Sequence, residues 1–147
     1  DNGAEVVIAS TSRGTAVGML GARIEPDLTL DEVDTKDYDA IVVVGGGGSR
    51  QYLWNNSALH GIVKEAYNDN KVVAAICVSP VVLAKAGLLE GKKATVFPGQ
   101  DTFSELKKGG AILVDEGVIA TGMLVTGCGP EVSEEFGRSV VNVLSRS

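Results

Sequence analysis

The chain has 147 residues, of which 44% are hydrophobic and 22% are charged, and its formal net charge is −6 at neutral pH. These totals predict a single globular domain over residues 1–147 with enough apolar material for a core. The acidic balance excludes the basic surface that nucleic-acid binding needs. No apolar run approaches the roughly 20 residues that span a bilayer, so we expect no membrane contact. Two distant cysteines and one histidine cannot form an ordinary structural zinc site, and we expect neither a metal nor a cofactor.

The first four residues have the pattern of a helix end closed by a glycine, at Gly3. No helix precedes them in the sequence, and neither an initiator methionine nor a signal-peptide pattern is present. We therefore expect the domain to be N-terminally incomplete. The missing piece would be a strand and a helix of roughly 20–30 residues, most of a βαβ unit, before Asp1.

The first third of the chain predicts short strands. Residues 5–10 have the composition of a buried strand, and residues 16–20 that of a hairpin arm. Residues 23–30 predict an edge strand because Pro26 cannot donate to a sheet ladder. An acidic stretch at 31–37 predicts a loop or one helical turn. The strongest strand is 38–44, and it runs directly into four consecutive glycines.

The glycine run at 45–48 could hold a phosphate, but the pattern is wrong for the known loops. The dinucleotide motif fails because Arg50 stands at its third glycine position, and no Gly-Lys-Ser/Thr follows as a P-loop requires. The alternative is that the glycines let backbone N–H groups approach a substrate closely. We favour this second interpretation.

A helix is predicted from Ser57, as its N-cap, to about Asn68, because apolar residues recur on one face at helical spacing. His60 lies off that face, which favours a solvated histidine over a catalytic one. Tyr52 and Trp54 precede the helix in a turn. Core packing or an interface between subunits is the simplest role for these two aromatic side chains.

The chain is organised around residues 72–87, an apolar strand that runs into a helix with Cys77 at the junction. Pro80 suits the first helical position, Ser79 the N-cap and Gly87 the C-cap. A nucleophile elbow has this arrangement, with small residues two before and two after the nucleophile; here they are Ala75 and Ser79. The helix start would favour a thiolate on Cys77. The alternative is a small buried cysteine at a strand end.

The rest of the chain continues the alternation of strands and helices. Strands are predicted at 93–97, 111–114, 118–121 and 123–126, and helices at 102–108 and from Pro130 to the C-terminus. Such alternation indicates an α/β fold with a doubly wound, mostly parallel sheet between helices. Sites in these folds gather at the carboxyl ends of the strands. The glycine run, Cys77 and Cys128 all follow strand ends and could share one crevice.

The sequence resembles the ThiJ/PfpI (DJ-type) superfamily. The resemblance rests on the strand-to-glycine turn at 42–47, the A-A-I-C-x-x-P elbow, the A-K-A-G-L-L-E-G-K-K-A-T segment after it and G-x-G-P before the last helix. It implies a flavodoxin-like sandwich in a cytoplasmic homo-oligomer, which agrees with the low cysteine count of a reducing compartment. It also implies Cys77 as nucleophile, with the Gly47 and Val78 N–H groups as an oxyanion hole. Gly46, Ser79, Gln51 and Cys128 are further candidates for the crevice.

The chain departs from the family pattern where a base would be needed. The peptidase branch has histidine directly after the cysteine, where this chain has Val78, and an acidic residue where it has Gln51. Another branch has histidine in place of Phe97. The family implies a glutamate in the missing N-terminal piece that hydrogen-bonds the cysteine.

Two functions stay open. One is an intracellular hydrolase of peptidase or glyoxalase/deglycase type that acts on a small-molecule or peptide substrate through the Cys77 thiolate. The other is a non-catalytic oxidation sensor or protein-protecting module that uses the same thiol. We also expect Tyr52, Leu53 and Trp54 to form an exposed apolar patch at which the chain associates into at least a dimer.

Overall fold

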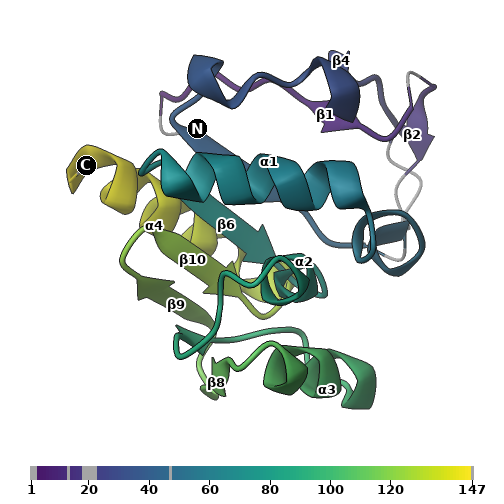
Figure 1. Cartoon of the computed structure of the whole chain (residues 1–147). Coiled ribbons are helices and arrows are strands. Elements are labelled where there is room, and N and C mark those ends of the chain that lie inside the picture. Colours follow the sequence, from purple (N-terminus) through teal and green to yellow (C-terminus); the bar gives the residue numbers. More distant parts are fainter. Residues whose placement is uncertain (1–2, 13, 18–22, 47, 147) are drawn as a thin grey trace.

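The computed structural model describes residues 3–12, 14–17, 23–46 and 48–146. Helices cover both faces of a four-stranded sheet, which confirms the predicted α/β, flavodoxin-like class (Figure 1). In spatial order the strands are β5 (Ala40–Val43), β6 (Val72–Ile76), β10 (Leu124–Gly127) and β9 (Val118–Thr121). The first three are parallel and β9 is antiparallel to β10. The carboxyl ends of β5, β6 and β10 therefore meet at one edge.

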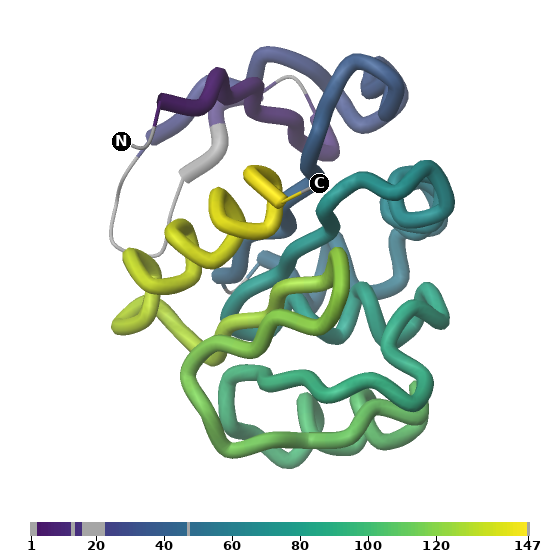
Figure 2. The backbone as a smooth tube through the Cα atoms, turned by 90° about the vertical axis from the view of Figure 1, so that its left-hand side faces the viewer, coloured from purple at the N-terminus to yellow at the C-terminus, as the bar shows by residue number. Residues whose placement is uncertain are grey.

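The core consists of two layers on either side of β6, because its five buried residues alternate between the two faces. Val73 and Ala75 face α1 (Ser57–Asn68) and α2 (Pro80–Lys85). The opposite face packs on α4 (Ser133–Arg146), which crosses in front of the sheet in Figure 2. A further helix, α3 (Gln100–Lys108), packs against α2.

The remaining described elements are short. Three two-stranded pairs and four irregular helical turns complete the fold: β1 (Ala9–Ser10) with β4 (Leu28–Thr29), β2 (Ala16–Val17) with β3 (Arg23–Ile24), β7 (Lys93–Ala94) with β8 (Ile112–Leu113), η1 (Leu30–Glu32), η2 (Thr35–Asp37), η3 (Ser49–Leu53) and η4 (Pro130–Val132). The acidic stretch thus forms two short helical turns, where a loop or one turn was predicted. Residues 23–30 give two separate strands rather than one, and part of the predicted hairpin arm lies outside the described residues.

The prediction of a buried strand at 5–10 is wrong. Only Ala9 and Ser10 are assigned to a strand, and Val6 is 75% exposed. β1 pairs with β4, and β5 is the terminal strand of the main sheet rather than a central one. A cavity of about 540 Å³ lies between these elements, lined by apolar residues of β1, β4 and β5. Val42 on β5 and Val44 directly after it consequently remain 44% and 65% exposed.

The helix predicted at 57–68 is confirmed with those limits, but its N-cap is Asn56 rather than Ser57. The Asn56 side-chain oxygen accepts a hydrogen bond from the Leu59 N–H at 3.0 Å. Asn and Ser are nearly equivalent caps, so the sequence alone does not separate two adjacent candidates. Among the described residues, no helix is long and apolar enough to cross a membrane.

Candidate active site at the end of strand β6

Cys77 lies where β6 turns into α2, as the strand-to-helix pattern predicts. Its φ of +64° is in the left-handed region, which residues with a side chain rarely adopt. The backbone on both sides holds it there: the Cys77 N–H donates to the Gly127 carbonyl at 2.9 Å, and its carbonyl accepts from the Phe97 N–H at 2.7 Å. The thiol is half-buried and unbonded to another cysteine. This combination of a strained, fixed backbone and an accessible sulfur is the geometry of a nucleophile elbow.

Gly45 makes the closest approach to this turn. A Cβ built on Gly45 would lie 2.4 Å from the Cys77 Cβ, 3.2 Å from its sulfur and 3.1 Å from the Ile76 carbonyl oxygen. No side chain fits in that space, so glycine is required where β5 ends beside β6. The first residue of the glycine run therefore serves the packing of the elbow.

Ser79 occupies the position before Pro80, but it does not cap the helix as predicted. Its backbone is already in the right-handed helical region, where its side chain makes no capping bond. The hydroxyl instead donates to the Val44 carbonyl at 2.6 Å and lies 2.7 Å from the Ser49 hydroxyl. Both serine side chains are buried, and their hydrogen bonds tie the elbow to the residue after β5 and to the start of η3.

The residue after the cysteine, Val78, is anchored by Trp54. The Trp54 indole N–H donates to the Val78 carbonyl at 3.0 Å, and the ring is buried with 8% exposure. Trp54 therefore belongs to the core, which was one of the two roles expected for it, and it does not contribute to the predicted exposed patch. Tyr52 is 55% exposed and Leu53 is half-buried. A buried indole N–H needs a hydrogen-bond acceptor, and the Val78 carbonyl supplies one. Among the described residues, none accepts a hydrogen bond from the Val78 N–H.

Arg50, in η3, brings a positive charge to the site. Its guanidinium lies over the Trp54 ring, 5.3 Å from the ring centroid, and forms two hydrogen bonds to Asp101, at 2.7 and 3.3 Å. Asp101 lies in the first turn of α3. The hydrogen bond to Asp101 raises the pKa of Arg50, and the negative charge of the Cys77 sulfur raises it further. Arg50 thus lies within electrostatic range of Cys77.

Cys128 lies one residue beyond β10 and is half-buried. Burial raises the pKa of its thiol, and the neighbouring Glu131 carboxylate adds to the effect. The Cys128 sulfur lies 4.0 Å from a Glu131 oxygen. Its charge also interacts with that of Cys77, so the two thiols belong to the same region. The shift disfavours the thiolate of Cys128, as expected for a cysteine beside a carboxylate.

The other predicted residues have these positions. Gly46 follows Gly45 with a φ of +112°, and its carbonyl accepts from the Ser49 N–H. Gln51 is exposed in η3. Gly47 lies outside the described residues. The His60 ring is half-buried and hydrogen-bonds the Trp54 carbonyl at 2.8 Å, so the only histidine is not simply solvated as predicted. In the described part of the chain, no group of three His, Cys, Asp or Glu side chains could hold a metal ion.

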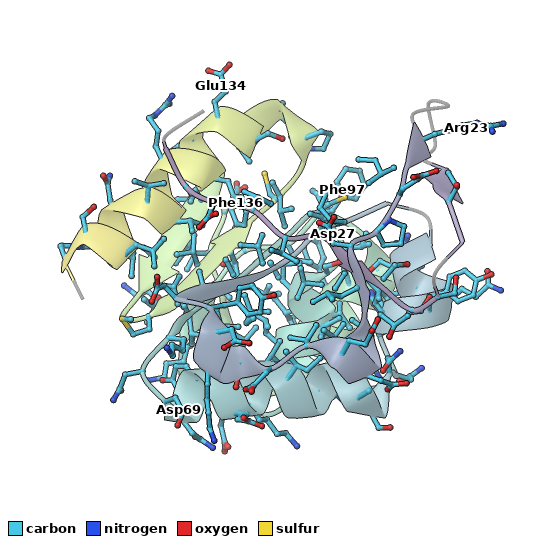
Figure 3. The ribbon with its side chains drawn as sticks, turned by 90° about the horizontal axis from the view of Figure 1, so that it is seen from above. Arg23, Asp27, Asp69, Phe97, Glu134 and Phe136 are labelled. Atoms are coloured by element: carbon cyan, nitrogen blue, oxygen red, sulfur yellow. The ribbon has the colours of Figure 1, made fainter. Side chains whose placement is uncertain are left out.

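Two features of the site were missed in the sequence. Gly45 could have been found, because it is the first glycine after the strand and the strand end faces the elbow. The pair of Arg50 and Asp101 had no sequence signal, since its members are 51 residues apart. Phe97 also contributes to the site through its backbone; its side chain, labelled in Figure 3, is 40% exposed.

A separate hollow at Gly122 and Met123 lies at the start of β10, away from Cys77.

A family model of the DJ-1/PfpI family matches residues 1–143. The chain belongs to the DJ-1/PfpI family. It is 51% identical over 146 residues to an uncharacterised protein of Methanocaldococcus jannaschii, covering 99% of this chain and 71% of the relative. It is 34% identical to a Pyrococcus horikoshii protein named a deglycase, covering 98% and 85%.

Solved structures agree with this assignment. The ThiJ/PfpI domain protein of Brachyspira murdochii superimposes with a TM-score of 0.94 at 35% identity, over 99% of this chain and 83% of the other. The oxidized DJ-1 of Toxoplasma gondii gives 0.84 at 30% identity, over 97% and 77%. The resemblance noted in the sequence and the fold that it implied are therefore correct.

Proposed function

We propose that this DJ-1/PfpI chain is a cysteine-dependent hydrolase of glyoxalase or deglycase type that acts on small carbonyl compounds. The observation that carries the proposal is the geometry of Cys77, which is half-buried and held at a φ of +64°. The N–H group of the next residue, Val78, donates a hydrogen bond to no described residue and is free for a substrate. Relatives that are named deglycases support the substrate class. The sequence departures at Val78 and Gln51 argue against the peptidase branch.

The chemistry would begin with addition of the Cys77 thiol to an aldehyde carbon. A carbon–sulfur bond forms, the carbonyl π electrons move to oxygen, and the thiol proton ends on that oxygen. Donors aimed at the developing oxyanion stabilise this step. The Val78 N–H is the described candidate, and the Gly47 N–H is the second group that the family resemblance implies.

For a 2-oxoaldehyde, the reaction can finish without an external oxidant. A hydrogen shift within the adduct reduces the neighbouring carbonyl to an alcohol and oxidises the carbon bound to sulfur to a thioester. Water then cleaves the thioester to release a 2-hydroxy acid and the free thiol. This balance agrees with the expected absence of a cofactor. A glutamate before Asp1 would carry the proton transfers.

The decisive experiment is turnover of methylglyoxal followed by formation of lactate. We expect activity in the wild-type chain, loss of at least 100-fold in Cys77→Ser and retention of most activity in Cys128→Ser, since losing a nucleophile removes the covalent step. The protein should carry its natural N-terminal residues. Equal activity in Cys77→Ser and the wild type would contradict the proposal.

A second candidate function is an oxidation sensor or a protein-protecting module. Among the described residues no histidine or carboxylate forms a hydrogen bond with the Cys77 sulfur, and a related solved structure is of an oxidized protein. Stoichiometric oxidation of Cys77 by dilute peroxide without any methylglyoxal turnover would favour this function.

We also propose that the chain works as a homo-oligomer in the cytoplasm. Trp54 is buried, so of the predicted patch Tyr52, at 55% exposure, is the side chain left to take part in a contact. Sedimentation velocity at micromolar concentration is expected to show at least a dimer, and a 15.2 kDa species alone would contradict it.

A further inference from the structure

We infer that Arg50 is a specificity-determining residue of the Cys77 site, and that it selects small carbonyl substrates that carry a carboxylate. This inference rests on the proposed function of Cys77. It concerns which substrates the site prefers, and its test separates that preference from the reactivity of the cysteine itself.

The position of Arg50 is fixed relative to the elbow by a chain of contacts. The Val78 carbonyl, directly after Cys77, holds the Trp54 indole, and the Trp54 ring supports the Arg50 guanidinium at 5.3 Å. A guanidinium that lies over an aromatic face stays available at its edges for in-plane hydrogen bonds. Arg50 is therefore connected through the Trp54 side chain to the residue that directly follows Cys77.

Asp101, the ion-pair partner of Arg50, follows the Phe97 segment, which is hydrogen-bonded to the backbone of Cys77. Asp101 is four residues after Phe97, whose N–H binds the Cys77 carbonyl, and its Oδ1 also accepts from the Thr102 N–H at 2.8 Å. The Arg50–Asp101 pair thus joins η3, which follows β5, to α3, which follows the Phe97 segment. It spans the two segments between which Cys77 lies.

The ion pair leaves Arg50 able to bind a second anion. Asp101 uses the Nε and one Nη of the guanidinium, and arginine has five N–H donors in a planar fork. The two side chains are 44% and 50% exposed, so their attraction is screened by water and is not strong enough to exclude a competing carboxylate. Bidentate recognition of a carboxylate is what this planar group does best.

The negative charge around the site makes a cation necessary for binding an anionic substrate, and Arg50 supplies one. The chain carries a net charge of −6, and Asp115 and Glu131 both act on Cys128 in the same region. An anionic substrate would be repelled there unless a cation received it. The Trp54 contact holds the Arg50 guanidinium on the segment that directly follows Cys77, and the charge of Cys77 is among the causes that raise the pKa of Arg50, after that of Asp101.

A pair of alkylating reagents that differ only in charge tests this inference. Iodoacetate and iodoacetamide transfer equivalent groups to a thiolate with loss of iodide, but only iodoacetate carries a carboxylate. The ratio of their second-order rates at Cys77 reports anion recruitment, because the thiolate fraction cancels. The measurement uses the Cys128→Ser background, so that Cys77 alone reacts, and compares Arg50→Gln, Arg50→Lys and the control Arg138→Gln. Arg138 lies on α4 and is 62% exposed.

We expect the iodoacetate-to-iodoacetamide ratio to fall about threefold to tenfold in Arg50→Gln, to recover in part in Arg50→Lys and to stay unchanged in Arg138→Gln. In the protein with Arg50 intact, 1 M KCl should lower the ratio toward that of Arg50→Gln, because salt screens a charge at this distance. This second measurement needs no variant and applies even if Arg50→Gln folds poorly.

The outcomes separate the two claims. An unchanged ratio in Arg50→Gln and in high salt, with normal iodoacetamide reactivity, overturns the role of Arg50 and leaves the proposed function standing. Failure of Cys77 to react with iodoacetamide at all would instead contradict the proposed function. If the proposed function of Cys77 and the role of Arg50 are both correct, glyoxylate should inhibit methylglyoxal turnover more strongly in the wild type than in Arg50→Gln.

Discussion

Gly45 and Cys77 are packed so closely that a single methyl group on the glycine would overlap the cysteine side chain. The built Cβ of Gly45 lies 2.4 Å from the Cys77 Cβ and 3.1 Å from the Ile76 carbonyl oxygen. The end of β5 and the elbow after β6 are therefore parts of one rigid corner. The position of the Cys77 side chain therefore depends on the absence of a side chain at Gly45, just after the neighbouring strand.

We expect Gly45→Ala to destabilise the fold by about 1–3 kcal/mol, the usual range for an overpacked core, and to lower the alkylation rate of Cys77. Gly61→Ala is the matched control, because a Cβ there meets no atom within 4 Å and the residue lies in the exposed part of α1. Alanine in a helix should stabilise by roughly 0.5–1 kcal/mol. Urea unfolding measures both changes, and equal effects would contradict the packing argument.

Cys77 should be the more reactive of the two thiols. Burial and Glu131 raise the pKa of the Cys128 thiol, so its thiolate fraction near neutral pH is small. Limiting iodoacetamide at pH 6.5, followed by peptide mass mapping, should label Cys77 many times faster. Glu131→Gln should speed the labelling of Cys128 and so reduce the difference in rate between the two thiols, because it removes one of the two causes that raise the pKa of Cys128. Faster labelling of Cys128 in the wild type would contradict both roles proposed for Cys77.

The link between α2 and α3 should make stability depend on acid pH. The Lys85 ammonium, 2.7 Å from the carboxylate, lowers the pKa of Glu105 below its ordinary value of 4.5. A carboxyl group with a lowered native pKa stabilises the fold above the pKa of the unfolded chain. That contribution is lost as the pH falls through the native value.

Glu105→Gln should therefore cost of the order of 1 kcal/mol or less at pH 7 and nothing near pH 2. Unfolding free energies measured between these pH values check the difference. Glu134→Gln, which removes a 94% exposed carboxylate, should leave the pH profile unchanged. A constant offset of Glu105→Gln at all pH values would show that the loss is steric rather than electrostatic.

Peptide-bond cleavage should be weak or absent. Val78 stands after the cysteine where the peptidase branch has its base, and the His60 ring is engaged by the Trp54 carbonyl. Losing a positioned general base costs on the order of 10²–10⁴ in rate. Casein or fluorogenic peptides incubated with the purified protein should show almost no cleavage. Robust cleavage that disappears in Cys77→Ala would show that a base acts on Cys77 after all.

We propose that a strand followed by a helix, in the polypeptide before Asp1, occupies the apolar cavity between β1 and β5. The cavity of about 540 Å³ separates β1 from β5, each of which already pairs in parallel on its other side. Val42 and Val44 lie on the sheet face that α4 covers only over β6 and β10. A strand would satisfy the edge of β5, and a helix would bury these two side chains.

Extending the chain with its natural upstream residues should raise the thermal midpoint by several degrees, since burying the exposed half or so of each valine stabilises by about 1 kcal/mol each. Val44→Asp tests the placement: it should be tolerated in residues 1–147 alone and destabilising in the extended chain. Ile112→Asp, at a 51% exposed site on β8, is the control and should behave alike in both. No difference between the two chains would contradict the proposal.

The sequence by itself determined the class of the fold and the position of Cys77 at a strand-to-helix turn. Periodicity and turn residues are local properties, and they located α1, β9 and the junction at Cys77 correctly. The elbow is also local, because a strand, a small-residue turn and Pro80 lie within ten residues. The resemblance to the DJ-1/PfpI family depended on the same contiguous segments.

The tertiary structure alone decided which distant groups meet at the elbow. Arg50 joins Asp101 across 51 positions, the Trp54 indole reaches Val78 across 24, and the Ser79 hydroxyl reaches the Val44 carbonyl across 35. Sequence spacing says nothing about such pairs, because they arise from the parallel register that sets the ends of β5 and β6 side by side. The capping role predicted for Ser79 and the exposure predicted for Trp54 were wrong for this reason: their hydrogen-bond partners lie in segments distant along the chain, after the ends of β5 and β6.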